Sequence, residues 1–96
     1  MEDKKKLVLI VEDDEAIAVT EKNILEKNGF SVIIFNNGEE AVNEVSRNKD
    51  IDIIIIDLEI GNNGVNGVKT SELILQQRNI PIIFCIGNNE ERYIEK

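Results

Sequence analysis

Four consecutive isoleucines that run into an aspartate constrain the fold more than any other feature of this chain. They lie within the stretch Asp52–Glu59, between Asp52 and Asp57. A strand that is apolar at every position is covered on both faces, which is typical of a parallel sheet between two layers of helices. Asp57 comes where the chain leaves the sheet, and ligands of open parallel sheets bind at the carboxyl ends of the strands. The stretch therefore predicts both a fold class and a functional carboxylate.

Other apolar runs of similar length are expected to form the neighbouring strands. The predicted strands are Leu7–Val11, Ser31–Phe35, Ile53–Asp57 and Ile80–Ile86. Glycine- and asparagine-rich segments lie between these runs and the helical patterns, as in loops. One of them, Gly61–Gly67, has no Lys-Ser or Lys-Thr after its glycines, so a nucleotide-binding P-loop is not expected.

Helical spacing of apolar residues predicts three helices between the strands. Asp14 is expected to cap the first, which Asn28-Gly29 ends. The second runs from Glu39 to about Arg47, and the third from a cap at Asn66 to about Gln77. The residues expected on their inner faces are Ile17, Thr20, Ile24 and Leu25, then Ala41, Val42 and Val45, then Ser71, Ile74 and Leu75. Residues 90–96 resemble the opening of one more helix.

Alternating strands and helices of this length predict an α/β fold with a doubly wound parallel sheet and right-handed crossovers. Numbered along the chain, the strands are expected in the order 2-1-3-4. The first helix then covers one face of the sheet, and the other two helices cover the opposite face. The order reverses between strands 1 and 3, and such a switch point is where a site is expected.

Acidic residues follow the two strands that meet at this switch point. Glu12 and Asp13 end the first strand, and Asp57 ends the third. Because parallel strands finish at the same edge of the sheet, these carboxylates are expected to converge. Close like charges are costly unless one pKa is raised or a cation binds. An oxygen-only cluster suits Mg²⁺ or Mn²⁺, and Asp57 beside such an ion could act as a nucleophile toward a phosphoryl group.

Composition excludes several classes of function. The net charge is −8, from 19 acidic and 11 basic residues, which disfavours direct binding to nucleic acid or to anionic membranes. Histidine is absent, which removes Ser-His triads and His-ligated zinc. The single cysteine, Cys85, cannot form an internal disulfide, so a reducing, cytoplasmic location is expected. No apolar run is long enough to span a bilayer, and 96 residues suffice for one small domain, residues 1–96.

Three segments resemble the receiver domain of two-component response regulators, which has a flavodoxin-like topology. They are Leu7–Glu15, Asp52–Glu59 and Ile80–Phe84. The loop 61–67 and the helix after it look most like receivers found alongside sensor kinases and sensory domains. The resemblance implies that the domain accepts a phosphoryl group from a sensor histidine kinase and is not a turnover enzyme.

The resemblance also implies a role for each acidic residue of the predicted site. Asp57 would be the phosphoryl acceptor, with Mg²⁺ (or Mn²⁺) held by Glu12, Asp13, Asp57 and the backbone carbonyl of Glu59. Asp14 falls one place beyond the family's acidic pair and is better explained as the helix cap.

Two departures from the family pattern bear on function. Ile86 stands where the family places a Ser or Thr hydroxyl, and Cys85 before it is expected to point to the other face of the strand. A fifth strand with its lysine, and a fifth helix, are not found, so the domain is interpreted as C-terminally incomplete. The fourth strand would then be an uncharged edge beside an open sheet face. This predicts that the chain self-associates, or that missing sequence or a partner covers both.

Three functions follow from these observations. The first is a phosphoacceptor receiver. The second is a degenerate receiver that keeps the fold as a docking or dimerisation module, which Ile86 favours. The third, more distant, is a Mg²⁺-dependent phosphatase, because Asp57-Leu58-Glu59 is similar to an aspartate-nucleophile motif; that family, however, places its motif on the first strand.

Overall fold

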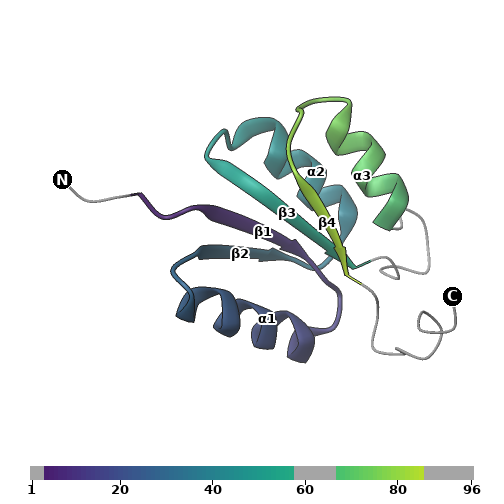
Figure 1. Ribbon diagram of the computed structural model, residues 1–96. Coiled ribbons are helices and arrows are strands. Elements are labelled where there is room, and N and C mark those ends of the chain that lie inside the picture. Colours follow the sequence, from purple (N-terminus) through teal and green to yellow (C-terminus); the bar gives the residue numbers. More distant parts are fainter. Residues whose placement is uncertain (1–3, 58–66, 86–96) are drawn as a thin grey trace, which may run out of the picture.

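The computed structural model describes residues 4–57 and 67–85 of the chain, which form a layered α/β structure (Figure 1). Four parallel strands make one sheet in the order β2-β1-β3-β4. The elements are β1 (Leu7–Val11), α1 (Glu15–Lys27), β2 (Ser31–Phe35), α2 (Gly38–Arg47), β3 (Ile51–Asp57), α3 (Gly67–Leu75) and β4 (Ile82–Cys85). The predicted fold class and strand order are confirmed. As expected, α1 covers one face of the sheet, and α2 and α3 cover the other.

Two apolar layers form the core, one on each face of the sheet. Toward α2 and α3, the buried strand residues Leu9, Ile54 and Ile56 pack with Val45 and Ile74. The layer toward α1 is smaller, and its buried members are Val8, Ile10 and Val32. Side chains of a strand alternate between faces, so β3 sends Ile54 and Ile56 to one layer and Ile53 and Ile55 to the other. The unbroken isoleucine run is explained by this double burial.

The inner faces of two helices differ from the prediction. On α1 the buried residue is Ala18, whereas Thr20 is exposed and Ile24 is 55% exposed. A small residue at the contact lets the helix lie close to β1 and β2. On α3, Leu75 is 51% exposed, because the face toward the sheet carries Thr70, Ser71 and Ile74. The prediction that Thr20, Ile24 and Leu75 lie on the inner faces of their helices is therefore wrong.

The caps of α1 and α2 have clear causes in the sequence. The carboxylate of Asp14 accepts hydrogen bonds from the backbone N–H groups of Ala16 and Ile17 at 2.9 and 3.2 Å, so the predicted cap is confirmed. After α1 ends, Gly29 has φ +95°, a left-handed conformation that favours glycine. Helix α2 begins one residue earlier than predicted, at Gly38, because Asn37 is its N-cap.

Strand ends also shift from their predicted positions. Strand β3 begins at Ile51, and its register with β1 shifts between Leu7 and Val8. Asp52 stabilises this irregularity, since its carboxylate accepts a hydrogen bond from the backbone N–H of Leu7 at 2.8 Å. Strand β4 begins at Ile82, two residues later than predicted. The cap at Asn66, the position of Ile86 and the predicted helix at 90–96 lie outside the described residues.

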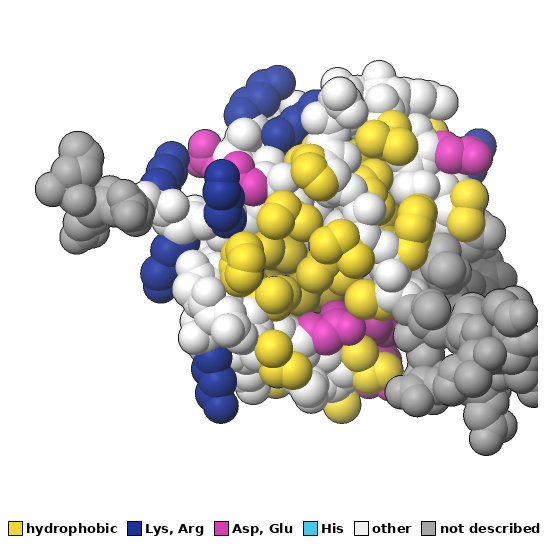
Figure 2. Space-filling view, in the orientation of Figure 1, with side chains coloured by type: hydrophobic (Ala, Val, Ile, Leu, Met, Phe, Trp, Pro, Cys, Tyr) yellow, Lys and Arg dark blue, Asp and Glu magenta, His cyan; other side chains and the backbone are white. Residues whose placement is uncertain are grey.

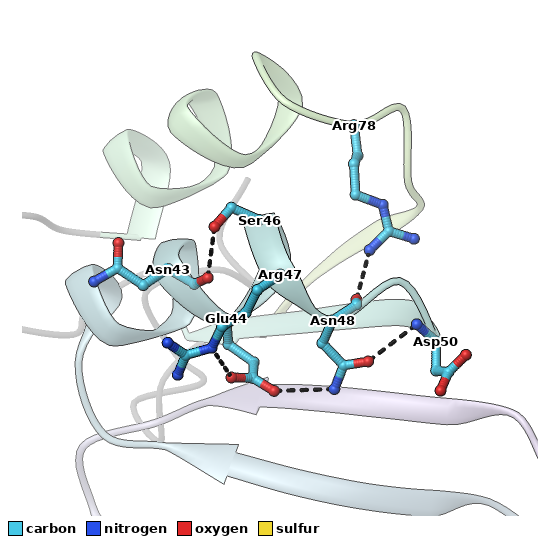
Figure 3. Close-up of polar contacts among 7 residues, drawn as sticks. All are labelled: Asn43, Glu44, Ser46, Arg47, Asn48, Asp50 and Arg78. Atoms are coloured by element: carbon cyan, nitrogen blue, oxygen red, sulfur yellow. Dashed lines mark hydrogen bonds and ion pairs between the residues drawn. The ribbon is translucent and has the colours of Figure 1, made fainter.

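A polar cluster joins the segment after α3 to the segment before β3 (Figure 3). The guanidinium of Arg78 donates to the carbonyl oxygens of Asn48 at 3.1 Å and Ile51 at 2.9 Å. The side chain of Asn48 in turn donates to the carboxylate of Glu44 at 2.9 Å. These contacts hold α2, β3 and the chain entering β4 together at the amino ends of the strands, away from the edge where Glu12 and Asp57 lie.

Candidate functional site

Three carboxylates meet at the carboxyl edge of the sheet. The side chains of Glu12, Asp13 and Asp57 each offer an oxygen, and these oxygens all lie within 4.8 Å of one another. The topology causes this proximity, because β1 and β3 are neighbours and Val11 pairs with Ile56. The residues that follow these strands therefore emerge side by side. The predicted convergence of the three acids is what the structure shows.

Two of the three acids are buried. Glu12 is 4% exposed and Asp57 is 8% exposed, whereas Asp13 lies at the surface. The backbone N–H of Glu12 donates to the carbonyl oxygen of Phe35 at 3.0 Å. Its carboxylate accepts a hydrogen bond from the backbone N–H of Asp14 at 3.1 Å. These bonds fix Glu12 beneath the site and leave Asp13 at its opening.

Burial controls the protonation of the two inner acids. It raises the pKa of Glu12 to about 7, with a further increase from the negative charge of Asp57. Burial also raises the pKa of Asp57, while its hydrogen bond with Glu12 acts in the opposite direction. The two carboxyl groups therefore compete for one proton near neutral pH, and Glu12 retains it more strongly.

This donor set suits a hard divalent cation. All three ligands are carboxylate oxygens, two buried and one exposed, which leaves coordination positions open on the solvent side. A cation there would offset the burial and the like charge that otherwise favour a proton on Glu12. The acidic cluster can thus hold a metal ion, and its residues are those that the sequence predicted for one. Glu59, whose backbone carbonyl was the fourth predicted ligand, lies outside the described residues.

Two side chains beside the site were missed by sequence reasoning. Cys85 of β4 pairs in register with Asp57, and its thiol donates to the carboxylate of Glu21 on α1, with an Sγ to Oε2 distance of 3.8 Å. Burial raises the pKa of Cys85 to about 11, and the charge of Glu21 adds to the effect. The thiol therefore stays protonated and unreactive at neutral pH.

Glu21 was detectable in principle, because it lies one helical turn from Ile17 and Ile24. Burial is the main cause that raises the pKa of the Glu21 carboxyl group, and the negative charge of Asp57 adds to it. Cys85 faces α1, as Asp57 does. The prediction that Cys85 and Ile86 point to opposite faces of the strand is untested, because Ile86 lies outside the described residues.

Comparison with known proteins identifies the family. The family model described as the response regulator receiver domain matches residues 8–96. This chain belongs to that family. A receiver is a signalling domain rather than a classical enzyme, and the acidic cluster at the carboxyl edge of the sheet is where receivers bind their ion.

The receiver domain is similar to parts of two longer curated proteins. The transcriptional regulatory protein YvrH of Bacillus subtilis is 33% identical over 88% of this chain and 35% of its own length. The CAI-1 autoinducer sensor kinase/phosphatase CqsS of Vibrio cholerae is 29% identical over 92% of this chain and 13% of its own length.

Among solved structures, the N-terminal domain of a response regulator/sensory box/GGDEF protein from Carboxydothermus hydrogenoformans is similar. It is 41% identical, with a TM-score of 0.82, over 88% of this chain and 67% of that one. The receiver domain thus spans about a third or less of the two curated relatives. Within the described parts of this receiver, no helix has the length and apolar character needed to cross a membrane.

Proposed function

We propose that this receiver domain accepts a phosphoryl group on Asp57 from a phosphohistidine of a sensor histidine kinase, with Mg²⁺ (or Mn²⁺) as the cofactor. The observation that supports the proposal is the cluster itself. Asp57 is 8% exposed and its carboxylate lies within 4.8 Å of those of Glu12 and Asp13, in a chain of the receiver family. The kinase partner is supported by the similarity of this chain to part of the sensor kinase/phosphatase CqsS. The reducing cytoplasm is the proposed location, because the chain has a single cysteine.

The ionisation of the two buried acids depends on the cation. A carboxylate must be ionised to attack phosphorus, and a cation held by Glu12 and Asp57 would displace the proton that burial otherwise favours and leave Asp57 ionised. An oxygen of Asp57 then forms a bond to phosphorus as the P–N bond to the donor imidazole breaks. The imidazole leaves with the electron pair and takes a proton, and an aspartyl phosphate remains.

The cation would be held by Glu12, Asp13 and Asp57, with the backbone carbonyl of Glu59 as the further ligand that the family resemblance implies. Its positive charge would offset the negative charge of the incoming phosphoryl group. Asp14 takes no part, because its carboxylate binds the N–H groups at the start of α1.

Incubation with acetyl phosphate and Mg²⁺, followed by intact-mass measurement, tests the proposal. We expect one adduct of about 80 Da on the wild-type chain and none on Asp57→Asn. Asp50→Asn is the matched control, because Asp50 is an exposed aspartate that precedes β3 at the opposite edge of the sheet. An adduct that persists in Asp57→Asn would contradict the assignment of Asp57.

The adduct measurement and an assay with phosphate esters distinguish the other two functions. A folded wild-type chain that forms no adduct would support the degenerate receiver, in which Ile86 replaces the switching hydroxyl. Continuous release of phosphate from phosphate esters would support the phosphatase.

A further inference from the structure

A pocket lies at the amino ends of the strands, at the opposite edge of the sheet from the acidic cluster. Its volume is about 530 Å³. The first residues of β1, β2 and β3 and the segments before β1 and β3 line it: Lys4, Lys5, Lys6, Leu7, Ser31, Lys49, Asp50 and Asp52. A pocket of this size falls within the usual range for small ligands, roughly 300–1,000 Å³.

Four lysines give this pocket its charge, and we call it the lysine pocket. Three of them precede β1, whereas Lys49 precedes β3, so the fold brings two distant segments together. All four side chains are exposed, and none of them is in an ion pair within residues 4–57 and 67–85. Figure 2 shows Lys and Arg side chains along the left of the molecule, where the strands of Figure 1 begin. A chain with a net charge of −8 therefore has one positively charged end.

Two carboxylates also line the lysine pocket. That of Asp52 is already used, because it accepts a hydrogen bond from the backbone N–H of Leu7 at 2.8 Å. Asp50 is exposed, and its backbone N–H donates to the side chain of Asn48 at 3.0 Å. The ammonium groups still outnumber the carboxylates. Because part of the positive charge is offset, an anion with several negative charges is favoured over one with a single charge.

We infer that the lysine pocket binds a small polyanion of the phosphate class, such as a diphosphate group. Each lysine ammonium offers three hydrogen-bond donors on a flexible stem, which suits the many acceptor oxygens of a phosphate chain. The hydroxyl of Ser31 is a further donor in the pocket wall. Lys49 and the lysines before β1 come from different segments, so a diphosphate can contact both, one phosphate on each side.

Titration calorimetry with inorganic pyrophosphate tests the inference, at constant ionic strength and without divalent ions. Under these conditions the acidic cluster repels anions, so its role does not affect the result. We expect saturable binding of pyrophosphate and about tenfold weaker binding of inorganic phosphate. Lys49→Ala should weaken pyrophosphate binding about threefold, and the double variant Lys5→Ala/Lys49→Ala about tenfold. Lys49→Arg should bind as wild type does, because the charge remains.

Lys27→Ala is the matched control. Lys27 is the last residue of α1, is exposed, and lies outside the pocket lining, so this variant loses the same charge elsewhere. It should bind pyrophosphate as wild type does. Equal weakening by Lys27→Ala and Lys49→Ala would overturn the inference, because net charge alone would then cause the binding. Thermal unfolding of each variant checks that a loss of binding is not a loss of fold.

Amide chemical shifts locate the bound anion. Pyrophosphate should shift the resonances of Leu7, Ser31 and Asp50, which line the pocket, and leave those of Asp13 and Asp57 unchanged. The opposite pattern would place the anion at the acidic edge and overturn the inference. A poly-glutamate peptide that binds more tightly than pyrophosphate would also overturn it, since the ligand would then be an acidic protein segment. ADP distinguishes two sources of the diphosphate: equal affinity for ADP and pyrophosphate indicates a free phosphate chain, and tighter binding of ADP indicates a nucleotide.

Discussion

At the scale of single residues, the site consists of two acids that cannot both be ionised without cost. The backbone N–H of Glu12 donates to Phe35 and its carboxylate accepts from the backbone N–H of Asp14, while Asp57 follows a fully buried isoleucine, Ile56. Glu12 directly follows β1 and Asp57 ends β3, and these two strands are neighbours in the sheet. The repulsion is therefore built into the fold, and a proton or a cation must offset it.

Burial of Glu12, together with the negative charge of Asp57, predicts how stability depends on pH in the absence of divalent ions. The folded-state pKa of Glu12 is about 7, above its ordinary value of 4.5, so the folded state binds the proton more tightly than the unfolded state does. The contribution is fully present below pH 4.5 and is lost as the pH rises through about 7. We expect the free energy of unfolding to fall across this range by on the order of 1–2 kcal/mol, after allowance for solvent screening.

Glu12→Gln provides the comparison, measured by urea unfolding at several pH values. Glutamine keeps a hydrogen-bond donor near Asp57 but does not titrate, so the slope against pH should become shallower. A variant with the wild-type slope would show that other groups cause the dependence.

At the scale of elements, hydrophobic patterning predicted every strand and helix that the structure describes. The predictions failed where tertiary contacts decide. The shift in register between β1 and β3 is accompanied by a hydrogen bond between Leu7 and Asp52, which are 45 positions apart, so the local sequence pattern could not predict it. Ile24 has helical spacing suited to a core, yet it is 55% exposed in the fold. The contact between Glu21 and Cys85 joins residues 64 positions apart, so only the fold could place it beside the site.

Two neighbouring aspartates before α1 are expected to have different roles: Asp14 caps the helix and Asp13 binds the metal ion. Asp14→Ala should lower the free energy of unfolding by about 1 kcal/mol, because two backbone N–H groups lose their acceptor. Asp14→Asn should retain most of the stability, since asparagine caps equally well. Neither change should alter Mg²⁺ affinity greatly, whereas Asp13→Asn should weaken it with little effect on stability. Chemical unfolding and isothermal titration with Mg²⁺ measure both quantities. Loss of Mg²⁺ binding in Asp14→Ala would make Asp14 a ligand instead of a cap.

At the scale of the whole molecule, the strand order places different chemistry at the two ends of the sheet. At the amino ends, the Arg78 guanidinium donates to the carbonyl oxygens of Asn48 (Figure 3) and Ile51, and at the carboxyl ends the carboxylates of Glu12, Asp13 and Asp57 converge. Folding brings these acids together in a chain whose net charge is already −8. The free energy of the acidic edge is therefore coupled to the stability of the entire domain, and a ligand that neutralises this edge stabilises the fold.

That coupling predicts a stabilisation by Mg²⁺ that depends on pH. Because the cation competes with the proton on Glu12, Mg²⁺ should raise the melting temperature more at about pH 8 than at about pH 5.5. At a hundredfold excess over its dissociation constant, the ion should add about 2.7 kcal/mol to the free energy of unfolding. Asp57→Asn should be more stable than wild type without Mg²⁺, because one of the repelling charges is gone, and should gain little when Mg²⁺ is added. Asp50→Asn, at the other edge of the sheet, should gain as much as wild type does. If all three proteins gained equally, the effect would be general charge screening, and the acidic cluster would not be the Mg²⁺ site.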